Sequence, residues 1–221
     1  MTQRKARDYT YLIDKGGRNP LFFYKETLKL VDVHGKPARI FNVGLPKTGT
    51  TSFEDAMLNY GFKVSKGGQG GAWYKHLWFN RNFPDKFHEF HCHSNFAEWH
   101  HKRLVREFPN SHFIYTTRNM DKWLTSVEKQ LEKDKEIHYH YNRFADTYFR
   151  LYIDIFKSVT FERNKFIELW EQHHEYVLED KSINCLIIDL EDKNKEIKLA
   201  EFIGAKEVTK YPHKHKTQKS H

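Results

Sequence analysis

Residues 44–52, GLPKTGTTS, combine two glycines, one lysine and four hydroxyl side chains in a short stretch. A glycine loop that opens a helix binds anions, because backbone N–H groups point at the anion and the helix dipole favours negative charge there. In nucleotide hydrolases the loop has the pattern G-x-x-x-x-G-K-[ST], with the lysine directly after the second glycine. Gly44 and Gly49 keep this spacing, but Thr50 takes the lysine position and Lys47 comes two residues before Gly49. The stretch therefore predicts an anion-binding loop whose lysine is placed differently from that of a nucleotide hydrolase.

The residues that would complete a nucleotide hydrolase are also different. Such an enzyme needs an acidic magnesium ligand at the end of a strand beside the loop. Here the strand expected at residues 112–117 is followed by Arg118. Asp189 lies within the last expected strand, where it is equally suited to a cap or a loop. Without a metal, Lys47 and the hydroxyls would hold the anion, which suits a sulfuryl group better than the more highly charged γ-phosphate.

The segments around the loop alternate between strand and helix patterns. Short apolar runs bounded by turn residues predict strands, and apolar residues spaced by three and four predict helices. Strands are expected within 39–43, 61–65, 88–93, 112–117 and 185–190, and helices within 53–60, 96–108, 121–131, 144–159, 166–177 and 193–204. The loop thus lies between a strand and a helix, as a phosphate loop requires. The alternation predicts an α/β fold with a mostly parallel central sheet flanked by helices.

The length of 221 residues fits one domain. Residues 1–37 are predicted to form an N-terminal extension or hairpin, residues 38–216 the domain and residues 217–221 a flexible basic tail. The alternating run 28–44 surrounds a turn signal at 34–37, which predicts a hairpin or strand pair leading into the core. No apolar run approaches the roughly 18 residues of a membrane span, and the first residues lack the apolar core of a secretory signal. We therefore expect a cytoplasmic protein without a membrane span.

The charge and the cysteines narrow the possible partners. A net charge of +8 suits an anionic partner, such as a nucleic acid, a membrane surface or a phosphorylated small molecule. The basic residues are scattered, and no nucleic-acid-binding motif occurs, so no nucleic acid is expected. Cys92 and Cys185 lie in apolar, strand-like runs and are expected to be buried thiols in a reducing compartment. His91 and His93 flank Cys92 without metal-ligand spacing, so no metal site is expected.

Two stretches carry a resemblance to a known family. PKTGTTS at 46–52 resembles the 5′-phosphosulfate loop of sulfotransferases that use 3′-phosphoadenosine 5′-phosphosulfate (PAPS), whose usual form is P-K-[ST]-G-T-T. IYTTRNMDKWLTSV at 114–127 resembles the family's 3′-phosphate motif, because Arg118 leaves a strand and Ser126 follows eight residues later. Weaker similarity continues to residue 216. The two stretches in this order make the resemblance specific, and it covers residues 38–216.

The resemblance implies a P-loop-like sulfotransferase fold and a sulfotransferase activity. The enzyme would move a sulfuryl group from PAPS to a hydroxyl or amine by in-line displacement, leave adenosine 3′,5′-bisphosphate and require no metal. Lys47 would contact the bridging and sulfuryl oxygens and act in catalysis. Arg118 and Ser126 would bind the 3′-phosphate, for which a planar guanidinium is well suited. The rest of the donor-binding loop would comprise Pro46, Thr48, Gly49, Thr50, Thr51 and Ser52.

The base that takes the acceptor's proton is less well defined. In the cytosolic branch it is a histidine in a K-T-H-L-P stretch just after a strand, and FHCHSNF occupies that place here. His93 matches this histidine best, and His91 lies two residues earlier on the same strand face. Imidazole, with a pKa of about 6.5, suits the role. Other small sulfotransferases use an aspartate near here, where this chain has Ser94, so Glu54, Glu89 or no base stay open.

Several other questions stay open at this point. Phe53 stands where many members have a tryptophan that stacks on adenine, but it also suits a core position. The alternative functions are a P-loop nucleotide kinase or NTPase, a catalytically inactive nucleotide-binding protein of the same fold, and a nucleic-acid binder suggested by charge alone. The acceptor is expected to be a small molecule or a peptide. The aromatic stretches 70–83 and 139–156 suit the walls of an apolar pocket, and they suit an ordinary core equally well.

Overall fold

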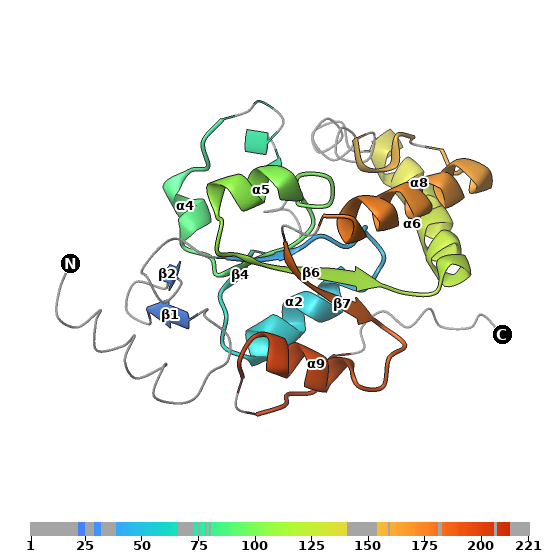
Figure 1. Ribbon diagram of the computed structural model, residues 1–221. Helices are drawn as coiled ribbons and strands as arrows, with labels where there is room; N and C mark the ends of the chain where they lie inside the picture. The colour runs from blue at the N-terminus through green and yellow to red at the C-terminus, as the bar shows by residue number, and fades with distance from the viewer. Residues whose placement is uncertain are drawn as a thin grey trace.

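The centre of the protein is a five-stranded sheet in which all neighbouring strands are parallel (Figure 1). The structure is a computed structural model, and it describes residues 22–24, 29–31, 39–65, 73–74, 76–77, 79, 81–140, 154–158, 160–180, 183–205 and 207–212. The strands lie in the spatial order β4 (Val64–Ser65), β5 (Cys92–His93), β3 (Ile40–Asn42), β6 (His112–Thr117) and β7 (Asn184–Asp189). The predicted α/β fold with a mostly parallel sheet is confirmed.

The strand order determines where a ligand fits best. From β3 the chain continues to β4 and β5 on one side of β3, and then crosses to β6 and β7 on the other side. In open parallel sheets, ligands bind beyond the carboxyl ends of the strands at the point where the order reverses. This point lies at the carboxyl end of β3, between β5 and β6. The glycine loop begins there.

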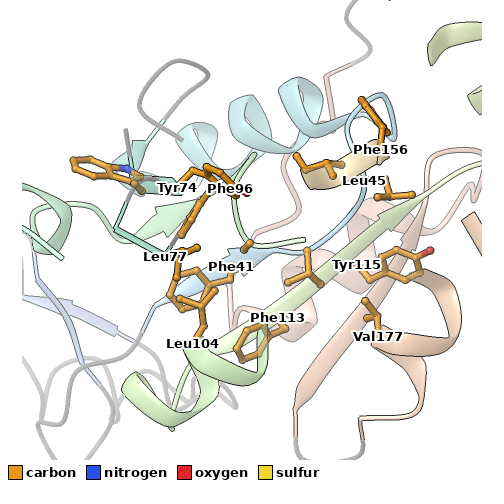
Figure 2. Packing of buried hydrophobic residues seen from close by; sticks show 14 of the residues in the cluster. Phe41, Leu45, Tyr74, Leu77, Phe96, Leu104, Phe113, Tyr115, Phe156 and Val177 are labelled. Atoms are coloured by element: carbon orange, nitrogen blue, oxygen red, sulfur yellow. The ribbon is translucent and has the colours of Figure 1, made fainter. Parts of the chain in front are cut away.

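Helices cover both faces of the sheet (Figure 1). One face carries α2 (Thr50–Asn59) and α9 (Lys195–Phe202), and the other carries α5 (His101–Glu107), α6 (Met120–His140) and α8 (Arg163–Leu178). Successive strand residues contribute to opposite layers, as the period of two in a strand requires. Ile40 packs in the apolar cluster with α2 and α9, whereas Phe41 packs in the larger cluster with α5, α6 and α8. Figure 2 shows Phe41 of this larger cluster between Leu104 and Phe96.

The strand before residue 94 is shorter than the sequence predicts. Residues 88–93 were expected to form one strand, but a short helix α4 (Asp85–His88) ends there and β5 contains two residues. Pro84 in extended conformation and Asp85 in the first turn both favour a helix start. Phe87 of this helix is fully buried and provides its contact with the core.

The strands on either side of residues 34–37 do not pair with each other as predicted. β2 (Lys29–Val31) pairs antiparallel with β1 (Phe22–Tyr24), while β3 pairs with β5 and β6. The residues of β3 are fully buried on both faces, which suits the centre of a parallel sheet and not one arm of a hairpin. The turn at 34–37 and most of the helix expected at 144–159 lie outside the described residues. The division of the chain at residues 37 and 216 stays a prediction.

The other predicted elements occur in the structure, although β4 and α5 are shorter than predicted and α6 is longer. β6 has the predicted bounds, and Asn119 caps α6 through a hydrogen bond from the Lys122 N–H to its side-chain oxygen (3.2 Å). Cys92 is buried, Cys185 is partly buried, and both are free thiols. Burial raises the pKa of Cys185 to about 12 and that of Cys92 well above its usual value. Of the helices within the described ranges, none is both long and apolar enough to cross a bilayer.

Candidate functional site

The glycine loop connects the carboxyl end of β3 to the first turn of α2, and both of its glycines are required by its shape. Gly49 has φ 88°, in the left-handed region that favours glycine. Gly44 passes so close to β6 that a β-carbon would lie 2.3 Å from the carbonyl oxygen of Thr116. The spacing of the two glycines therefore reflects one backbone turn and one close contact with a neighbouring strand.

Hydrogen bonds attach the loop to β6 from the inside. The side-chain oxygen of Asn42 accepts from the Gly44 N–H (2.9 Å) and from the Thr116 hydroxyl (3.1 Å). The Thr48 hydroxyl donates to the Leu45 carbonyl (2.6 Å) and lies 2.9 Å from the Thr116 hydroxyl. Thr48 is fully buried, so in this structure its hydroxyl supports the loop from within. Asn42 and Thr116 were not selected from the sequence, although a polar residue in a buried strand is the signal that could have found them.

The start of α2 is suited to an anion. Gly49 caps the helix without a side-chain hydrogen bond, and the first turn contains no acidic residue. The first intrahelical bond runs from the Phe53 N–H to the Gly49 carbonyl (3.0 Å). The N–H groups of a first helical turn have no partner within the helix, and the dipole adds partial positive charge. Thr51 is exposed in this turn, while Thr50 and Ser52 are largely buried.

Arg118 and helix α6 contact the loop segment that carries Lys47. The backbone of Lys47 has φ 73°, a conformation that a lysine rarely adopts. The indole N–H of Trp123 donates to the Pro46 carbonyl (2.9 Å), and the Arg118 guanidinium donates to the Lys47 carbonyl (3.3 Å). The Lys47 ammonium donates to the side-chain oxygen of Gln130 on α6 (3.0 Å). Trp123 and Gln130 were missed in the sequence, because their contacts depend on how α6 packs against the loop.

Arg118 and the loop are adjacent in space although they lie 71 residues apart in the sequence. Arg118 directly follows β6, and the neighbouring carboxyl end of β3 leads into the loop. Within the described part of the chain its buried Nε atom has no hydrogen-bond partner. A buried guanidinium donor without a partner beside an anion-binding loop fits a second anionic group.

Ser126 lies on the face of α6 that contacts the loop. Trp123 and Gln130 both reach the loop, and Ser126 stands three residues after the first and four residues before the second. Residues at these intervals share one face of a helix. Ser126 is partly buried there. The structure thus places Lys47, Arg118 and the helix face carrying Ser126 around one loop.

His93 is the last residue of β5, so it lies at the same edge of the sheet as the loop. The ring is fully buried and stacks on Phe87 with centroids 3.9 Å apart, and its Nδ1 lies 3.0 Å from the Ser65 hydroxyl. Burial, followed by the positive charges of Arg39 and neighbouring histidines, holds its pKa well below the usual value. The imidazole is therefore unprotonated at neutral pH, as a base must be, but it is covered in this structure. Its role as base stays a prediction.

His91 and Glu89 lie at the opposite edge of the sheet. The Nδ1 of His91 accepts from the Lys63 N–H (3.0 Å), and its carbonyl accepts from the N–H of Ile40, where β3 begins. Glu89 forms an exposed ion pair with Lys63 (3.0 Å). Since the loop follows the other end of β3, neither side chain is well placed to take a proton from an acceptor at the loop.

The structure also shows where three further residues singled out from the sequence lie. Phe53 is fully buried in the apolar cluster beneath α2, so it is a core residue in this structure. Asp189 accepts from the Glu191 N–H (2.9 Å) in a turn after β7. Glu54 is buried on α2 and accepts from the side-chain amide of Asn95 (2.7 Å), just beyond β5. Of the two alternative acids, Glu54 is thus the one at the loop's edge of the sheet.

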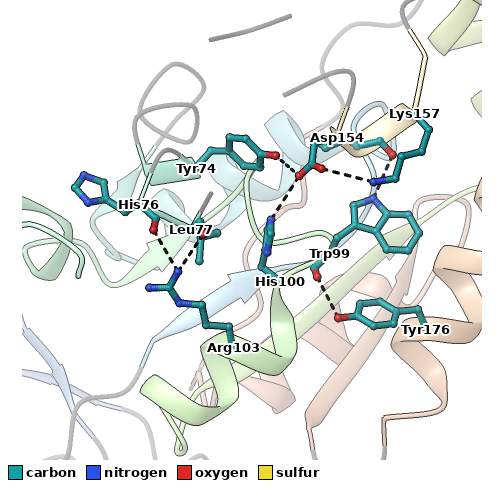
Figure 3. A network of polar contacts seen from close by, with 10 residues as sticks. Tyr74, His76, Leu77, Trp99, His100, Arg103, Asp154, Lys157 and Tyr176 are labelled. Atoms are coloured by element: carbon teal, nitrogen blue, oxygen red, sulfur yellow. Dashed lines mark hydrogen bonds and ion pairs between the residues drawn. The ribbon is translucent and has the colours of Figure 1, made fainter. Parts of the chain in front are cut away.

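The two aromatic stretches of the sequence meet in a polar cluster (Figure 3). The Tyr74 hydroxyl donates to Asp154, which also lies near His100 (3.8 Å) and Lys157 (3.6 Å). Burial and then the Asp154 hydrogen bond raise the pKa of Tyr74. Burial raises the pKa of Asp154, but the nearby His100, the Tyr74 hydrogen bond and Lys157 outweigh it, so the pKa is lowered overall. Tyr74 and Phe156 belong to the larger core cluster, so the apolar residues of these stretches that the structure describes there form part of the core.

One buried acid in this region was not noticed in the sequence. Glu98 follows β5 and is 1% exposed, and its Oε1 has no hydrogen-bond partner among the described residues. Burial raises the pKa of this carboxyl to about 8. Its backbone carbonyl contacts the ring Nε2 of His173 on α8 (3.1 Å). A carboxyl with this pKa is mostly protonated at neutral pH.

Comparison with known proteins agrees with this geometry. A family model described as a sulfotransferase domain matches residues 39–220, which include the glycine loop, Arg118 and Ser126. A comparison with curated proteins gives no match. A match over most of the chain, together with the parallel sheet and the loop at its centre, shows that the chain belongs to the sulfotransferase family.

Proposed function

We propose that the protein is a PAPS-dependent sulfotransferase that acts on a hydroxyl or amine of a small molecule or peptide. The observation that carries this proposal is the contact between the Arg118 guanidinium and the Lys47 carbonyl. It brings together the two stretches that resemble the 5′-phosphosulfate and 3′-phosphate motifs. PAPS carries anionic groups at both of these positions, so two adjacent sets of cationic and N–H donors suit it.

The donor-binding residues follow from this arrangement. The first turn of α2, with Gly49, Thr50, Thr51 and Ser52, would hold the 5′-phosphate through backbone N–H groups and hydroxyls. Pro46 and Thr48 would keep the loop in shape, because their carbonyl and hydroxyl are bonded within the protein.

The 3′-phosphate would lie at the other end of the site. Arg118 would bind it together with Ser126, and the unpartnered Nε of Arg118 adds a donor there.

Lys47 would act in the transfer itself. The donor, when bound, supplies a sulfuryl group whose removal leaves negative charge on a phosphate oxygen. An ammonium group beside this oxygen stabilises the developing charge, and such preorganised electrostatic contacts are commonly the largest contribution to catalysis. The left-handed backbone of Lys47 and its contacts with Arg118 and Gln130 fix the direction of this side chain.

The acceptor's proton would pass to a base at the carboxyl edge of β5, where His93 is the proposed residue. Its lowered pKa keeps the ring unprotonated, and its burial means that the acceptor must reach a covered ring. That burial also favours a second candidate function, a nucleotide-binding protein of the same fold without turnover. We place the protein in the cytoplasm as part of the same proposal, with no nucleic-acid partner and no metal requirement.

The proposal is tested with ³⁵S-labelled PAPS and a panel of hydroxyl and amine acceptors. Lys47→Ala and Arg118→Ala should each lower transfer by about 100-fold or more, the usual effect of removing one charge-stabilising donor. Lys129→Ala and Arg106→Ala, which change exposed residues of the same types, should transfer like the unmodified protein. Unmodified transfer by both site variants would refute the proposal. Donor binding without transfer to any acceptor would favour the second candidate function.

A further inference from the structure

The side chain of Gln130 makes a contact that neither family motif includes. Its oxygen accepts a hydrogen bond from the Lys47 ammonium (3.0 Å), and both side chains are partly buried. Gln130 lies on α6, one helical turn after Ser126. The same helix also holds the Pro46 carbonyl through Trp123. One helix therefore contacts both the backbone and the charged end of the loop segment that carries Lys47.

The backbone of Lys47 leaves its side chain little freedom of direction. Its left-handed conformation is fixed from both sides, by the Trp123 indole at Pro46 and the Arg118 guanidinium at Lys47 itself. With the backbone fixed, the remaining freedom lies in the four-carbon stem, whose end is flexible in lysine. The hydrogen bond to Gln130 restrains this end.

An amide is a suitable group for this purpose. Its oxygen is a neutral acceptor, so it orients the ammonium without neutralising the charge. A carboxylate at this position would pair with Lys47 and compete with an anionic ligand. An ammonium has three N–H donors, and the bond to Gln130 uses one of them.

We propose that Gln130 is a positioning residue that directs the Lys47 ammonium toward the sulfuryl end of the donor. This inference rests on the proposed function, because it assumes that PAPS is the ligand of the loop. It makes a specific distinction between two nucleotides. Adenosine 3′,5′-bisphosphate lacks the sulfuryl group, so its binding should depend little on where the ammonium points. PAPS binding should depend on it strongly.

The test measures the affinity of the full-length protein for PAPS and for adenosine 3′,5′-bisphosphate by calorimetry. Gln130→Leu should weaken PAPS binding by about 10-fold, the effect of losing one charged hydrogen bond, and change bisphosphate binding by less than about twofold. Gln130→Glu should weaken PAPS further, because it adds a negative charge. Gln172→Leu, which makes the same substitution at an exposed site on α8, serves as the control. The melting temperature of each variant checks that it is folded.

A double-mutant cycle shows whether Gln130 acts through Lys47. In a Lys47→Ala background, Gln130→Leu should have no further effect on PAPS binding. The inference is overturned if Gln130→Leu binds PAPS as the Gln172→Leu control does, or if its effect is undiminished without Lys47. If the unmodified protein binds neither nucleotide, the proposed function itself fails, and that outcome is distinct from the other two.

Discussion

At the scale of single residues, the shape of the site depends on how closely Gly44 approaches β6. Its backbone N–H bonds to Asn42, and its α-carbon faces the carbonyl of Thr116 with no space for a side chain. Gly44 is therefore required because no side chain fits at its position. Gly49 is required because of its left-handed backbone conformation. In the sequence the two glycines look equivalent, whereas the structure shows that each is required for a different reason.

Gly44→Ala should lower both stability and donor binding, because the new β-carbon would press on the backbone of β6. We expect a loss of about 3 kcal/mol in the free energy of unfolding, the upper part of the range for overpacking. Gly61→Ala is the comparison, because Gly61 has a positive φ (83°), which Gly44 does not, and open space around it, so this change adds backbone strain without overpacking. It should cost about 1–2 kcal/mol. Denaturant titration measures both, and equal losses would contradict the packing argument.

At the scale of elements, β6 and α6 together form the site. β6 contributes Thr116 to the interior of the loop, and Arg118, the residue after β6, contacts the loop at Lys47. α6 contributes Trp123, Ser126 and Gln130 along one face. The short connection between them places a strand end and a helix start beside the same loop. The spacing of Arg118 and Ser126 in the sequence thus corresponds to two positions beside one loop.

Much of this arrangement could be predicted from the sequence. The apolar run at 112–117 gave the bounds of β6, and strand, loop and helix followed from the pattern around Gly44. The pairing predicted between the strands on either side of residues 34–37 was wrong, because alternation alone does not show that β3 is buried between β5 and β6. Gln130 and Trp123 could not be found, since their hydrogen bonds join residues more than 75 positions apart.

At the scale of the whole molecule, buried titratable groups make stability depend on pH. Burial lowers the pKa of His112 to about 4 and that of His173 to about 3, and it also holds the pKa of His93 well below its usual value. These groups are neutral in the fold and protonated in the unfolded chain below a pH of about 6.5. The unfolded state then binds more protons, so stability decreases as the pH falls below 6.5. The raised pKa of Glu98 has the opposite effect on stability, but it is one group against the three histidines.

Above pH 6.5 Glu98 is the group that matters among these four. Its carboxyl keeps a proton in the fold up to a pH of about 8, whereas in the unfolded chain it loses the proton near pH 4.3. The folded state binds more protons, so stability should fall as the pH rises from 6.5 to 8, by up to about 1.4 kcal/mol per unit. Glu98→Gln should flatten this part of the curve, while the exposed Glu128→Gln should leave it unchanged. Urea unfolding at pH 5, 6.5 and 8 measures the effect, and an unchanged slope in Glu98→Gln would disprove the assignment.

The central claim is that the glycine loop and Arg118 form a clamp for a nucleotide with phosphates at both the 3′ and 5′ positions. Calorimetric titration with adenosine 3′,5′-bisphosphate and, separately, with ATP and magnesium tests it most directly. We expect the bisphosphate to bind at least about 10-fold more tightly than ATP with magnesium. We also expect Arg118→Ala to weaken binding of the bisphosphate by about 10- to 100-fold, as expected for a charged hydrogen-bond pair. Tighter binding of ATP with magnesium, or unchanged bisphosphate binding in Arg118→Ala, would contradict the claim.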